Sequence, residues 1–289
     1  MSQMEDVRTA FSAFADEWRP RIEKSLNELC PAVSPDHGKL REAMRYSLLS
    51  GGKRLRPLLC LLAAKACGAD PAVAMTAGCA IEMVHAFSLI HDDLPCMDDD
   101  DLRRGKPTNH VAFGEATALL AGDALLSHAL SIFSDAGSIR VLGLATGEMI
   151  EGQMMDMAEK TSVDAAFLDE LNGKKTGALL RASLVLGAIA AGADEKKQEA
   201  LIAYGEGIGL AFQITDDLLD LTGDEKTAGK RLRKDADKGK KTYPAILGID
   251  ESRARVTSLM DGAVAALRPF GKAADELRGC AQMIAERKS

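Results

Sequence analysis

Apolar side chains recur at helical spacing along most of the chain. Near the start, Val7, Phe11 and Phe14 follow one another at intervals of four and three residues, which places them on one face of a helix. Glycine and proline clusters separate further segments of this kind. These predicted helices cover about 39–49, 57–67 and 72–94, then about 110–223 with short breaks near Gly137, Gly173 and Gly192, and finally 243 to the end. The pattern predicts an all-α protein with a polar, charged loop over 222–242.

Composition supports long helices in a single domain. No proline occurs between Pro107 and Pro244, so no helix breaker interrupts that stretch. Only 4% of the 289 residues are aromatic and 46% are hydrophobic, which suits helices better than sheets and excludes a disordered chain. Because the chain contains no linker, low-complexity segment or clean repeat, we expect one all-helical domain over residues 1–289.

Charge, cysteines and the N-terminal segment bear on partners and location. The net charge of −7 argues against a nucleic-acid partner. The six cysteines form no CxxC pair and no zinc spacing, which is typical of a reduced, intracellular protein. The first 29 residues carry acidic side chains in place of a signal-peptide core, and no run reaches 18 apolar residues. We therefore expect a cytoplasmic protein without stable membrane insertion.

A dense acidic run follows the helix predicted over 72–94. Six of the ten residues from 92 to 101 are aspartates, and a solvated acidic loop is the ordinary alternative for such a run. However, the run begins at the end of an apolar helix, and Pro95 breaks that helix so that Asp98 can fold back toward Asp92. Carboxylates packed so closely need cations, and hard oxygen ligands with room for water suit Mg²⁺.

A second acidic cluster lies within another apolar helix, at 212–220. Asp216 and Asp220 are four residues apart and share one helix face, to which Gln213 also belongs. Buried aspartates need partners, and ion pairs with Lys or Arg are the alternative explanation. Two aspartate motifs on otherwise apolar helices fit a shared metal cluster better.

Basic residues accompany both acidic clusters. Residues 51–57 join two glycines to three cations at a predicted helix start, where backbone amides also favour an anion. Arg103 and Arg104 follow the first acidic run, and eight basic residues lie over 226–241, most of which a solvated loop would explain. Acidic and basic clusters together indicate a substrate with several phosphates, held partly through Mg²⁺ and partly by direct cations.

Six short motifs follow one another along the chain. They are GGKRLRP at 51–57, HDDLPCMDDDDLRRGKPTNH at 91–110, GQMMD at 152–156, KTG at 175–177, FQITDDLLD at 212–220 and GKKTYP at 239–244. In this order they resemble the motifs of trans-isoprenyl diphosphate synthases, and most closely those of bacterial farnesyl diphosphate synthases and the related geranylgeranyl enzymes. The resemblance implies an orthogonal helical bundle of the isoprenoid synthase type around a central active-site cavity. It also implies three Mg²⁺ ions, which Mn²⁺ could replace, and a homodimer.

The resemblance implies roles by position. Asp92, Asp98 and Asp216 would hold the Mg²⁺ ions, with Asp93, Asp217 and Asp220 nearby, acting partly through bound water. The allylic diphosphate would be bound by Arg103, Lys175, Lys230 and Lys240, and the diphosphate of isopentenyl diphosphate by Lys53, Arg56, His85 and Arg104. Thr176 and Gln213 would face the developing carbocation. Alone, His85 could equally be a core histidine, but its place seven residues before Asp92 matches the family position.

These roles imply prenyl transfer by ionisation, condensation and elimination. Cations stabilise the charge on the leaving diphosphate, and a dry, apolar pocket protects the allylic carbocation until isopentenyl diphosphate attacks it. In the family, bulk near the position five residues before the first aspartate acts as a floor for the growing chain; here this residue is Phe87, followed by the small Ser88. Together with the inserted Pro95 and Cys96, Phe87 favours a C15 product, (2E,6E)-farnesyl diphosphate, over a C20 product.

Three other functions agree with part of the sequence. A helical His-Asp phosphohydrolase would use His91 and the following aspartate, with His37 or His85 as further ligands, but it leaves the second motif unexplained. A terpene cyclase usually has a different second motif, and a non-catalytic synthase subunit would normally have lost one motif.

The family pattern is broken in the basic loop, where Arg233 and Lys234 stand where relatives commonly have glycine and a small residue. We therefore expect this loop to be ordered differently over the allylic site.

Overall fold

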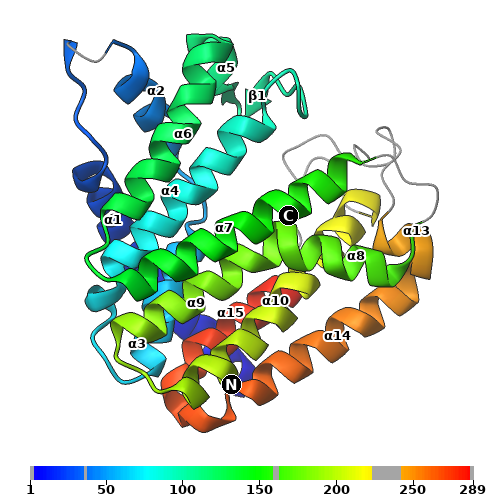
Figure 1. Ribbon diagram of the computed structural model, residues 1–289. Helices are drawn as coiled ribbons and strands as arrows, with labels where there is room; N and C mark the ends of the chain where they lie inside the picture. The colour runs from blue at the N-terminus through cyan, green and yellow to red at the C-terminus, as the bar shows by residue number, and fades with distance from the viewer. Residues whose placement is uncertain (1–2, 36–37, 159–162, 223–241, 287–289) are drawn as a thin grey trace.

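The computed structural model describes residues 3–35, 38–158, 163–222 and 242–286, which form helices joined by short connections (Figure 1). The α-helices are α1 (Gln3–Leu29), α2 (Leu40–Leu48), α3 (Leu55–Ala66), α4 (Met75–Asp92), α5 (Asn109–Phe113), α6 (Glu115–Ser131), α7 (Ala136–Met157), α8 (Ala165–Asn172), α9 (Ala178–Ala190), α10 (Glu195–Thr222), α13 (Tyr243–Leu247), α14 (Ile249–Ala266) and α15 (Asp275–Ala285). Two 3₁₀ segments, Pro71–Ala74 and Arg268–Ala274, complete the helical part. The all-α prediction is confirmed.

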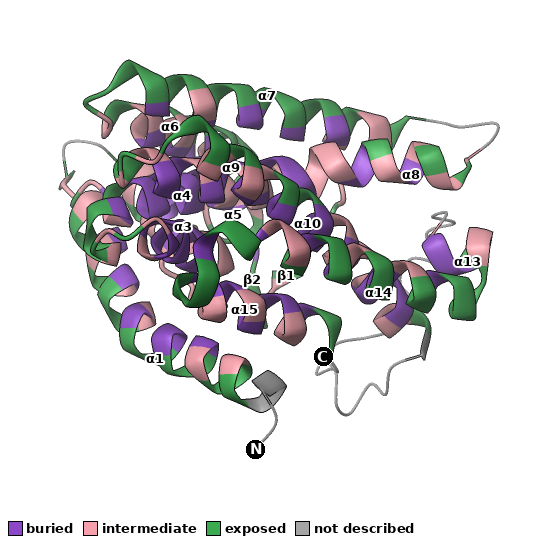
Figure 2. Ribbon diagram, turned by 90° about the horizontal axis from the view of Figure 1, so that it is seen from below, coloured by how far each residue is buried: buried purple, intermediate pink, exposed green. Residues whose placement is uncertain are grey.

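α3 and α4 form the centre of the bundle. Nine of the twelve residues of α3 are buried, and Figure 2 shows both helices purple on nearly all sides. α9 packs on α3, α6 packs on α4, and α14 and α15 pack on α10 and α1 respectively. One cluster of buried apolar side chains extends from Phe11 to Ile284, which is the arrangement expected of a single domain.

The core helix α4 is also the element that reaches the site. The segment Pro71–Asp92 is long and apolar enough to cross a membrane by length and composition. However, 67% of its most apolar window is buried inside the bundle, so its apolar surface is accounted for by packing against other helices. The helix ends at Asp92, which places the first carboxylate of the acidic run at the edge of the core.

Two local features depart from regular helix. The predicted break near Gly173 is a π-helical turn, Gly173–Gly177 (η3), set between α8 and α9. The segment after the acidic run, predicted as a loop, contains an antiparallel hairpin of β1 (Leu102–Arg103) and β2 (Lys106–Pro107). Its two turn residues, Arg104 and Gly105, have φ values of 54° and 75°, as the tight turns of two-residue hairpins require.

Candidate active site

A cavity of about 500 Å³ lies between α4, α7 and the π-turn. Its lining side chains are Arg56, His85, Phe87, Ser88, Leu89, His91, Asp92, Met97, Met149, Ile150, Gln153, Met154, Met157, Lys175 and Thr176. Charged and polar groups from the ends of α3 and α4 and from the π-turn stand beside a wall of methionine, isoleucine and phenylalanine. Such a cavity fits an amphiphile with an anionic head and a hydrocarbon tail.

The first acidic run folds back on itself at the end of α4. The Asp98 backbone N–H donates to the Asp92 carbonyl oxygen at 2.8 Å, so the predicted return of Asp98 toward Asp92 is present. Burial raises the pKa of Asp92 to about 6, and the negative charge of Asp98 adds to the rise. Burial and a neighbouring carboxylate both disfavour the charged form of a carboxyl group, and a divalent cation bound to the two carboxylates would neutralise them. The pair therefore fits Mg²⁺.

The described residues do not by themselves complete a metal site. In the ranges that the structure covers, no three His, Cys, Asp or Glu side chains gather closely enough to hold an ion. Mg²⁺ is commonly held by one or two carboxylates together with substrate phosphates and water. Asp92 and Asp98 would supply such a carboxylate pair at the cavity, with the remaining positions left to the substrate and to Asp216.

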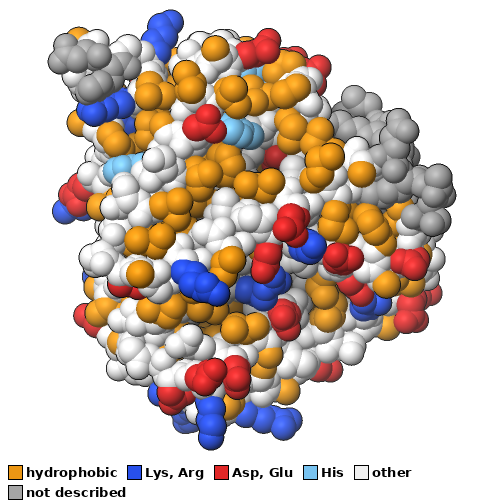
Figure 3. Space-filling model, viewed as in Figure 1, with side chains coloured by type: hydrophobic (Ala, Val, Ile, Leu, Met, Phe, Trp, Pro, Cys, Tyr) orange, Lys and Arg blue, Asp and Glu red, His pale blue; other side chains and the backbone are white. Residues whose placement is uncertain are grey.

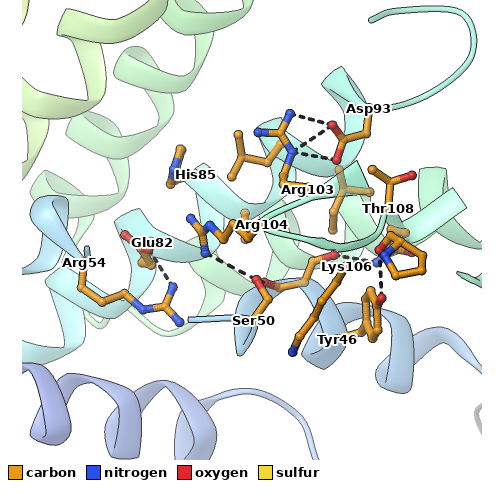
Figure 4. Close-up of a pocket in the computed structure, with 16 residues that line it drawn as sticks. Tyr46, Ser50, Arg54, Glu82, His85, Asp93, Arg103, Arg104, Lys106 and Thr108 are labelled. Carbon is orange, nitrogen blue, oxygen red and sulfur yellow. Dashed lines mark hydrogen bonds and ion pairs between the residues drawn. The ribbon is translucent and has the colours of Figure 1, made fainter. Parts of the chain in front are cut away.

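Asp93 is not among the residues that line this cavity, and it binds Arg103. The Arg103 Nε lies 2.9 and 2.8 Å from the two Asp93 carboxylate oxygens, and Nη2 lies 2.6 Å from Oδ1 (Figure 4). The Asp93 side chain is 3% exposed and that of Arg103 34% exposed. The resemblance implied a place near the metals for Asp93 and on the allylic diphosphate for Arg103; the structure shows the two residues bound to each other.

The hairpin also ties the acidic run to the 51–57 loop. The guanidinium of Arg104, at the hairpin turn, donates to the Gly51 carbonyl and lies 3.4 Å from the Ser50 hydroxyl (Figure 4). A Cβ on Gly52 would come within 2.8 Å of the same guanidinium. Gly52 also has a φ of 138°, a conformation that L side chains rarely adopt, so a larger residue at this position would be strained and would displace the Arg104 guanidinium.

The arginines of the 51–57 loop serve different purposes. Arg54 is buried and binds Glu23 at 2.7 Å, Glu82 at 2.8 Å and the Leu48 carbonyl at 2.8 Å, so it holds the loop to α1 and α4. Arg56 lines the cavity, and its buried Nε has no hydrogen-bond partner within the described part of the chain. An unpaired buried donor beside a cavity is the feature expected of an anion site.

His85 stands beside Arg56 at the cavity. Burial lowers the pKa of His85 well below its usual value, and the charges of Arg56 and Arg104 add to this effect. A neutral imidazole between two guanidinium groups can donate one hydrogen bond to an anion without adding charge. The structure thus brings Arg56, His85 and Arg104 together, whereas Lys53 is exposed on the same loop.

The second aspartate motif is anchored by α13. Asp217 is buried and accepts hydrogen bonds from Gln213 Nε2 at 2.9 Å and from the Tyr243 backbone N–H at 3.1 Å. Asp216 and Asp220 are half-buried on the same helix. Gln213, expected to face a carbocation, is engaged with Asp217. Lys230 and Lys240, and the departure at 233–234, lie outside the described residues.

Comparison with known proteins decides the family. Residues 37–268 match the family model described as polyprenyl synthetase. The chain belongs to this family. It is 41% identical to the farnesyl diphosphate synthase of Geobacillus stearothermophilus over 269 residues, covering 88% of this chain and 90% of that protein. It is 46% identical to the heterodimeric geranylgeranyl pyrophosphate synthase large subunit 1 of Arabidopsis thaliana over 250 residues, covering 80% and 67%.

Solved structures agree. The FPP/GFPP synthase from Zymomonas mobilis has a TM-score of 0.83 at 37% identity and covers 98% of this chain and 99% of that one. The geranylgeranyl pyrophosphate synthetase from Pyrococcus horikoshii has a TM-score of 0.87 at 33% identity, covering 99% and 100%. The fold is that of the isoprenyl synthases, and the chain is a prenyltransferase of the trans-prenyl diphosphate synthase type. The family resemblance is confirmed, and the phosphohydrolase alternative is excluded.

This polyprenyl synthetase uses α7 more extensively than the motifs indicated. Met149, Gln153 and Met157 line the cavity, and Gln153 Oε1 is buried without a hydrogen-bond partner among the described residues. Asp156 binds the Lys175 ammonium at 2.7 Å. The GQMMD motif was the available signal, because its amide and its carboxylate, Gln153 and Asp156, are three residues apart and therefore lie on one face of a helix.

Proposed function

We propose that this prenyltransferase condenses isopentenyl diphosphate with dimethylallyl and geranyl diphosphates to give (2E,6E)-farnesyl diphosphate. The reaction would use three Mg²⁺ ions, with Asp92, Asp98 and Asp216 as their ligands and Asp93, Asp217 and Asp220 close by. The observation that carries the C15 product is the position of Phe87. Its ring lies in the cavity wall five residues before Asp92 on α4, where it would stop a growing chain.

The residues divide into two binding ends. Arg56, His85 and Arg104, with Lys53, would hold the diphosphate of isopentenyl diphosphate. Lys175, Arg103, Lys230 and Lys240 would hold the allylic diphosphate near Asp92. When bound, Mg²⁺ would supply positive charge to the leaving diphosphate.

The rest of the cavity governs the fate of the carbocation. Its apolar wall would exclude water once substrate and a second subunit cover it, and Thr176 lines the same cavity beside Lys175, where its hydroxyl oxygen would meet a developing positive charge. The double bond of isopentenyl diphosphate attacks the allylic cation. The proton lost afterwards goes to the departed diphosphate, so the chain needs no general base of its own.

The proposed floor packs against a neighbouring ring of the same helix. Phe87 is 6% exposed, and its ring lies edge to face with His91, with 4.8 Å between the ring centres and 74° between the planes. His91 Nε2 in turn lies 2.9 Å from the Leu119 carbonyl of α6. Ser88 is small, and its hydroxyl donates to the His85 carbonyl at 3.0 Å. Because Phe87 is supported by a fixed ring, it should resist displacement by a growing chain.

Replacing Phe87 by Ala tests the floor. Phe87→Ala should shift the main product from C15 to C20, because the truncated side chain opens the wall five residues before Asp92. Purified protein would be incubated with Mg²⁺, dimethylallyl diphosphate and isopentenyl diphosphate, and the products analysed by chromatography and mass spectrometry. Phe133→Ala, in the connection between α6 and α7, is the matched control and should leave the product unchanged.

A C20 product is the second candidate, since the relatives include several proteins named geranylgeranyl pyrophosphate synthases. The wild-type product in the same assay decides between them. C15 from wild type that stays C15 in Phe87→Ala would contradict the floor assignment. Cyclic hydrocarbon would favour a cyclase, and no turnover would favour a non-catalytic subunit.

A homodimer is proposed for the exposed apolar surface of α6 and α7. Large apolar side chains are exposed along both helices, and Figure 3 shows them gathered over this face of the molecule. They are Leu119, Leu120, Ile139, Leu144, Ile150, Met154 and Met157. Patches of this kind mark association surfaces. Sedimentation equilibrium should give twice the chain mass of 30.8 kDa.

We also propose a cytoplasmic location, because α4 is a core helix of the bundle. No nucleic-acid partner is proposed.

A further inference from the structure

Lys175 and Thr176 reach the cavity from a π-turn and not from regular helix. The turn, Gly173–Gly177, interrupts an otherwise continuous helical run from α8 to α9. Its neighbouring lysines diverge. Lys174 pairs on the surface with Glu151 at 3.0 Å and Glu170 at 3.3 Å, whereas Lys175 and Thr176 line the cavity. A π-turn adds a residue to one helical turn and so changes the direction of the side chains in it.

The backbone of this turn rests on Gly152 of α7. A Cβ built on Gly152 would lie 2.3 Å from the Lys175 backbone nitrogen and 2.7 Å from its Cα. It would also lie 2.9 Å from the Lys174 carbonyl carbon. Backbone atoms cannot rotate away as a side chain can, so any larger residue at this position must push the π-turn off α7.

The turn is held on its other sides as well. Arg181 donates to the Gly173 carbonyl at 2.9 Å and binds Glu148 of α7 at 2.5 Å. On the side of α10, a Cβ on Gly209 would lie 3.1 Å from the Gly177 Cα. The π-turn therefore has little room to move between α7 and α10. A larger side chain at Gly152 should shift the backbone of Lys175 itself, because the rest of the turn is held in place.

Asp156 holds the end of the same lysine. It follows Gly152 by four residues and therefore shares its helix face. The Lys175 ammonium lies 2.7 Å from Asp156 Oδ2. Lys175 and Asp92 line the same cavity, and the positive charge of Lys175 opposes the rise that burial causes in the pKa of Asp92. Lys175 is thus fixed at its backbone by Gly152 and at its charged end by Asp156, in the cavity that Asp92 also lines.

We propose that Gly152 and Asp156 are positioning residues that set Lys175 and Thr176 for the allylic diphosphate. Gly152 admits the backbone of the π-turn to the surface of α7, and Asp156 fixes the Lys175 side chain toward Asp92. This role rests on the proposed function, in which Lys175 binds the allylic diphosphate. The isopentenyl diphosphate end is built on α3, α4 and the hairpin, so its affinity for substrate should be indifferent to the replacement of either residue.

Kinetics with the two substrates varied separately test this role. Gly152→Ala should lower kcat/KM for geranyl diphosphate by about 100-fold, as expected for a displacement on the order of 1 Å. The KM for isopentenyl diphosphate should change by less than about twofold. Calorimetry with the unreactive analogue geranyl thiolodiphosphate should show weaker binding without turnover. Asp156→Asn preserves the shape of the side chain and should lower kcat/KM for geranyl diphosphate by about tenfold, without a change in the KM for isopentenyl diphosphate. This variant tests the proposal if Gly152→Ala does not fold.

Two controls separate positioning from general damage. Gly262→Ala lies in the middle of α14, where a Cβ meets no atom within 4 Å, and should keep wild-type kinetics. Lys174→Ala removes only surface pairs and should do the same, whereas Lys175→Ala should match Gly152→Ala. Wild-type kinetics for Gly152→Ala or Asp156→Asn, or equal losses for both substrates, would overturn the positioning role alone. If Lys175→Ala also kept wild-type kinetics, the assignment of Lys175 to the allylic diphosphate would be overturned as well.

Discussion

The two aspartate pairs of this polyprenyl synthetase, Asp92–Asp93 at the end of α4 and Asp216–Asp217 on α10, share one arrangement. In each pair the first residue is half-buried and the second is buried, with exposed fractions of 2% for Asp93 and 6% for Asp217. The buried member accepts hydrogen bonds from other parts of the protein. The repeated Asp-Asp sequence therefore gives each cluster one half-buried carboxylate and one buried carboxylate that holds neighbouring parts of the protein together.

The pairs differ in what the buried aspartate holds. Asp93 binds the side chain of Arg103, ten residues away in the hairpin. Asp217 binds the backbone N–H of Tyr243, 26 residues away at the start of α13. The first contact fixes the Arg103 guanidinium beside the proposed Mg²⁺ ligands, whereas the second joins α10 to α13. Replacing the first member of either pair should therefore affect catalysis, and replacing the second should also affect stability.

The largest effect is expected at the first members. Asp92→Asn and Asp216→Asn should each lower kcat by about 100- to 1,000-fold, the range seen when one group that stabilises transition-state charge is removed. The Asp92→Asn variant should be no less stable than the wild type. Burial raises the pKa of Asp92 to about 6, so at pH 7 the folded protein carries a charge that burial disfavours. The Tm of Asp92→Asn, measured calorimetrically without Mg²⁺, should equal or exceed that of wild type.

Asp99→Asn is the matched control within the same acidic run. Asp99 is exposed and has a φ of 52°, a conformation that asparagine tolerates. Its kcat should stay within about twofold of wild type. If Asp99→Asn lost as much activity as Asp92→Asn, the density of negative charge would matter more than the position of each carboxylate, and the comparison of the pairs would fail.

An intermediate effect is expected at Asp93. Burial raises the pKa of Asp93 although the Arg103 guanidinium opposes the rise, so the charge alone does not stabilise the fold at pH 7. Asp93→Asn keeps the shape but leaves the Arg103 guanidinium without its carboxylate, and for that reason the free energy of unfolding should fall by about 1–3 kcal/mol. The less restrained guanidinium should also lower kcat/KM for the allylic substrate by about tenfold. Urea unfolding of this variant, of Arg103→Gln and of the double variant gives a thermodynamic cycle. Additive losses would show that the two side chains do not depend on each other.

Local pattern explains what the sequence could predict. The helices follow from apolar spacing, and the return of Asp98 follows from a proline placed after a helix end. Both depend on residues close together in the chain. The pairing of Asp93 with Arg103 depends on a hairpin whose turn residues, Arg104 and Gly105, have positive φ. The composition of this segment predicts only a loop and does not indicate which residues pair across a hairpin.

Tertiary contacts explain what the sequence could not predict. Arg54 and Arg56 look equivalent in GGKRLRP, yet Glu82 and Glu23 bind the first from other helices and leave the second at the cavity. Glu82, a lone acid within the apolar helix α4, was the available signal, because a buried carboxylate requires a cation. Apolar periodicity likewise indicates an interruption at Gly173 but cannot distinguish a π-turn from a helix break.

The smallest effect is expected at the far end of the Asp217 contact. Tyr243 also donates its hydroxyl to Asp169 at 2.9 Å, and Arg255 binds the same carboxylate. Tyr243→Phe removes only the hydroxyl bond and keeps the backbone N–H on Asp217. We expect a loss of about 1 kcal/mol in the free energy of unfolding and a fall in kcat of less than about threefold, measured by urea unfolding and steady-state kinetics.

Tyr204→Phe provides the control, because Tyr204 is fully buried on α10 and donates its hydroxyl to the Leu277 carbonyl at 2.7 Å, away from the cavity. It should lose similar stability and no activity. If Tyr243→Phe instead lowered kcat as far as Asp216→Asn, the side chain of Tyr243 would be what places the second motif. The backbone contact to Asp217 would then be incidental, and the two aspartate pairs would differ more than their burial indicates.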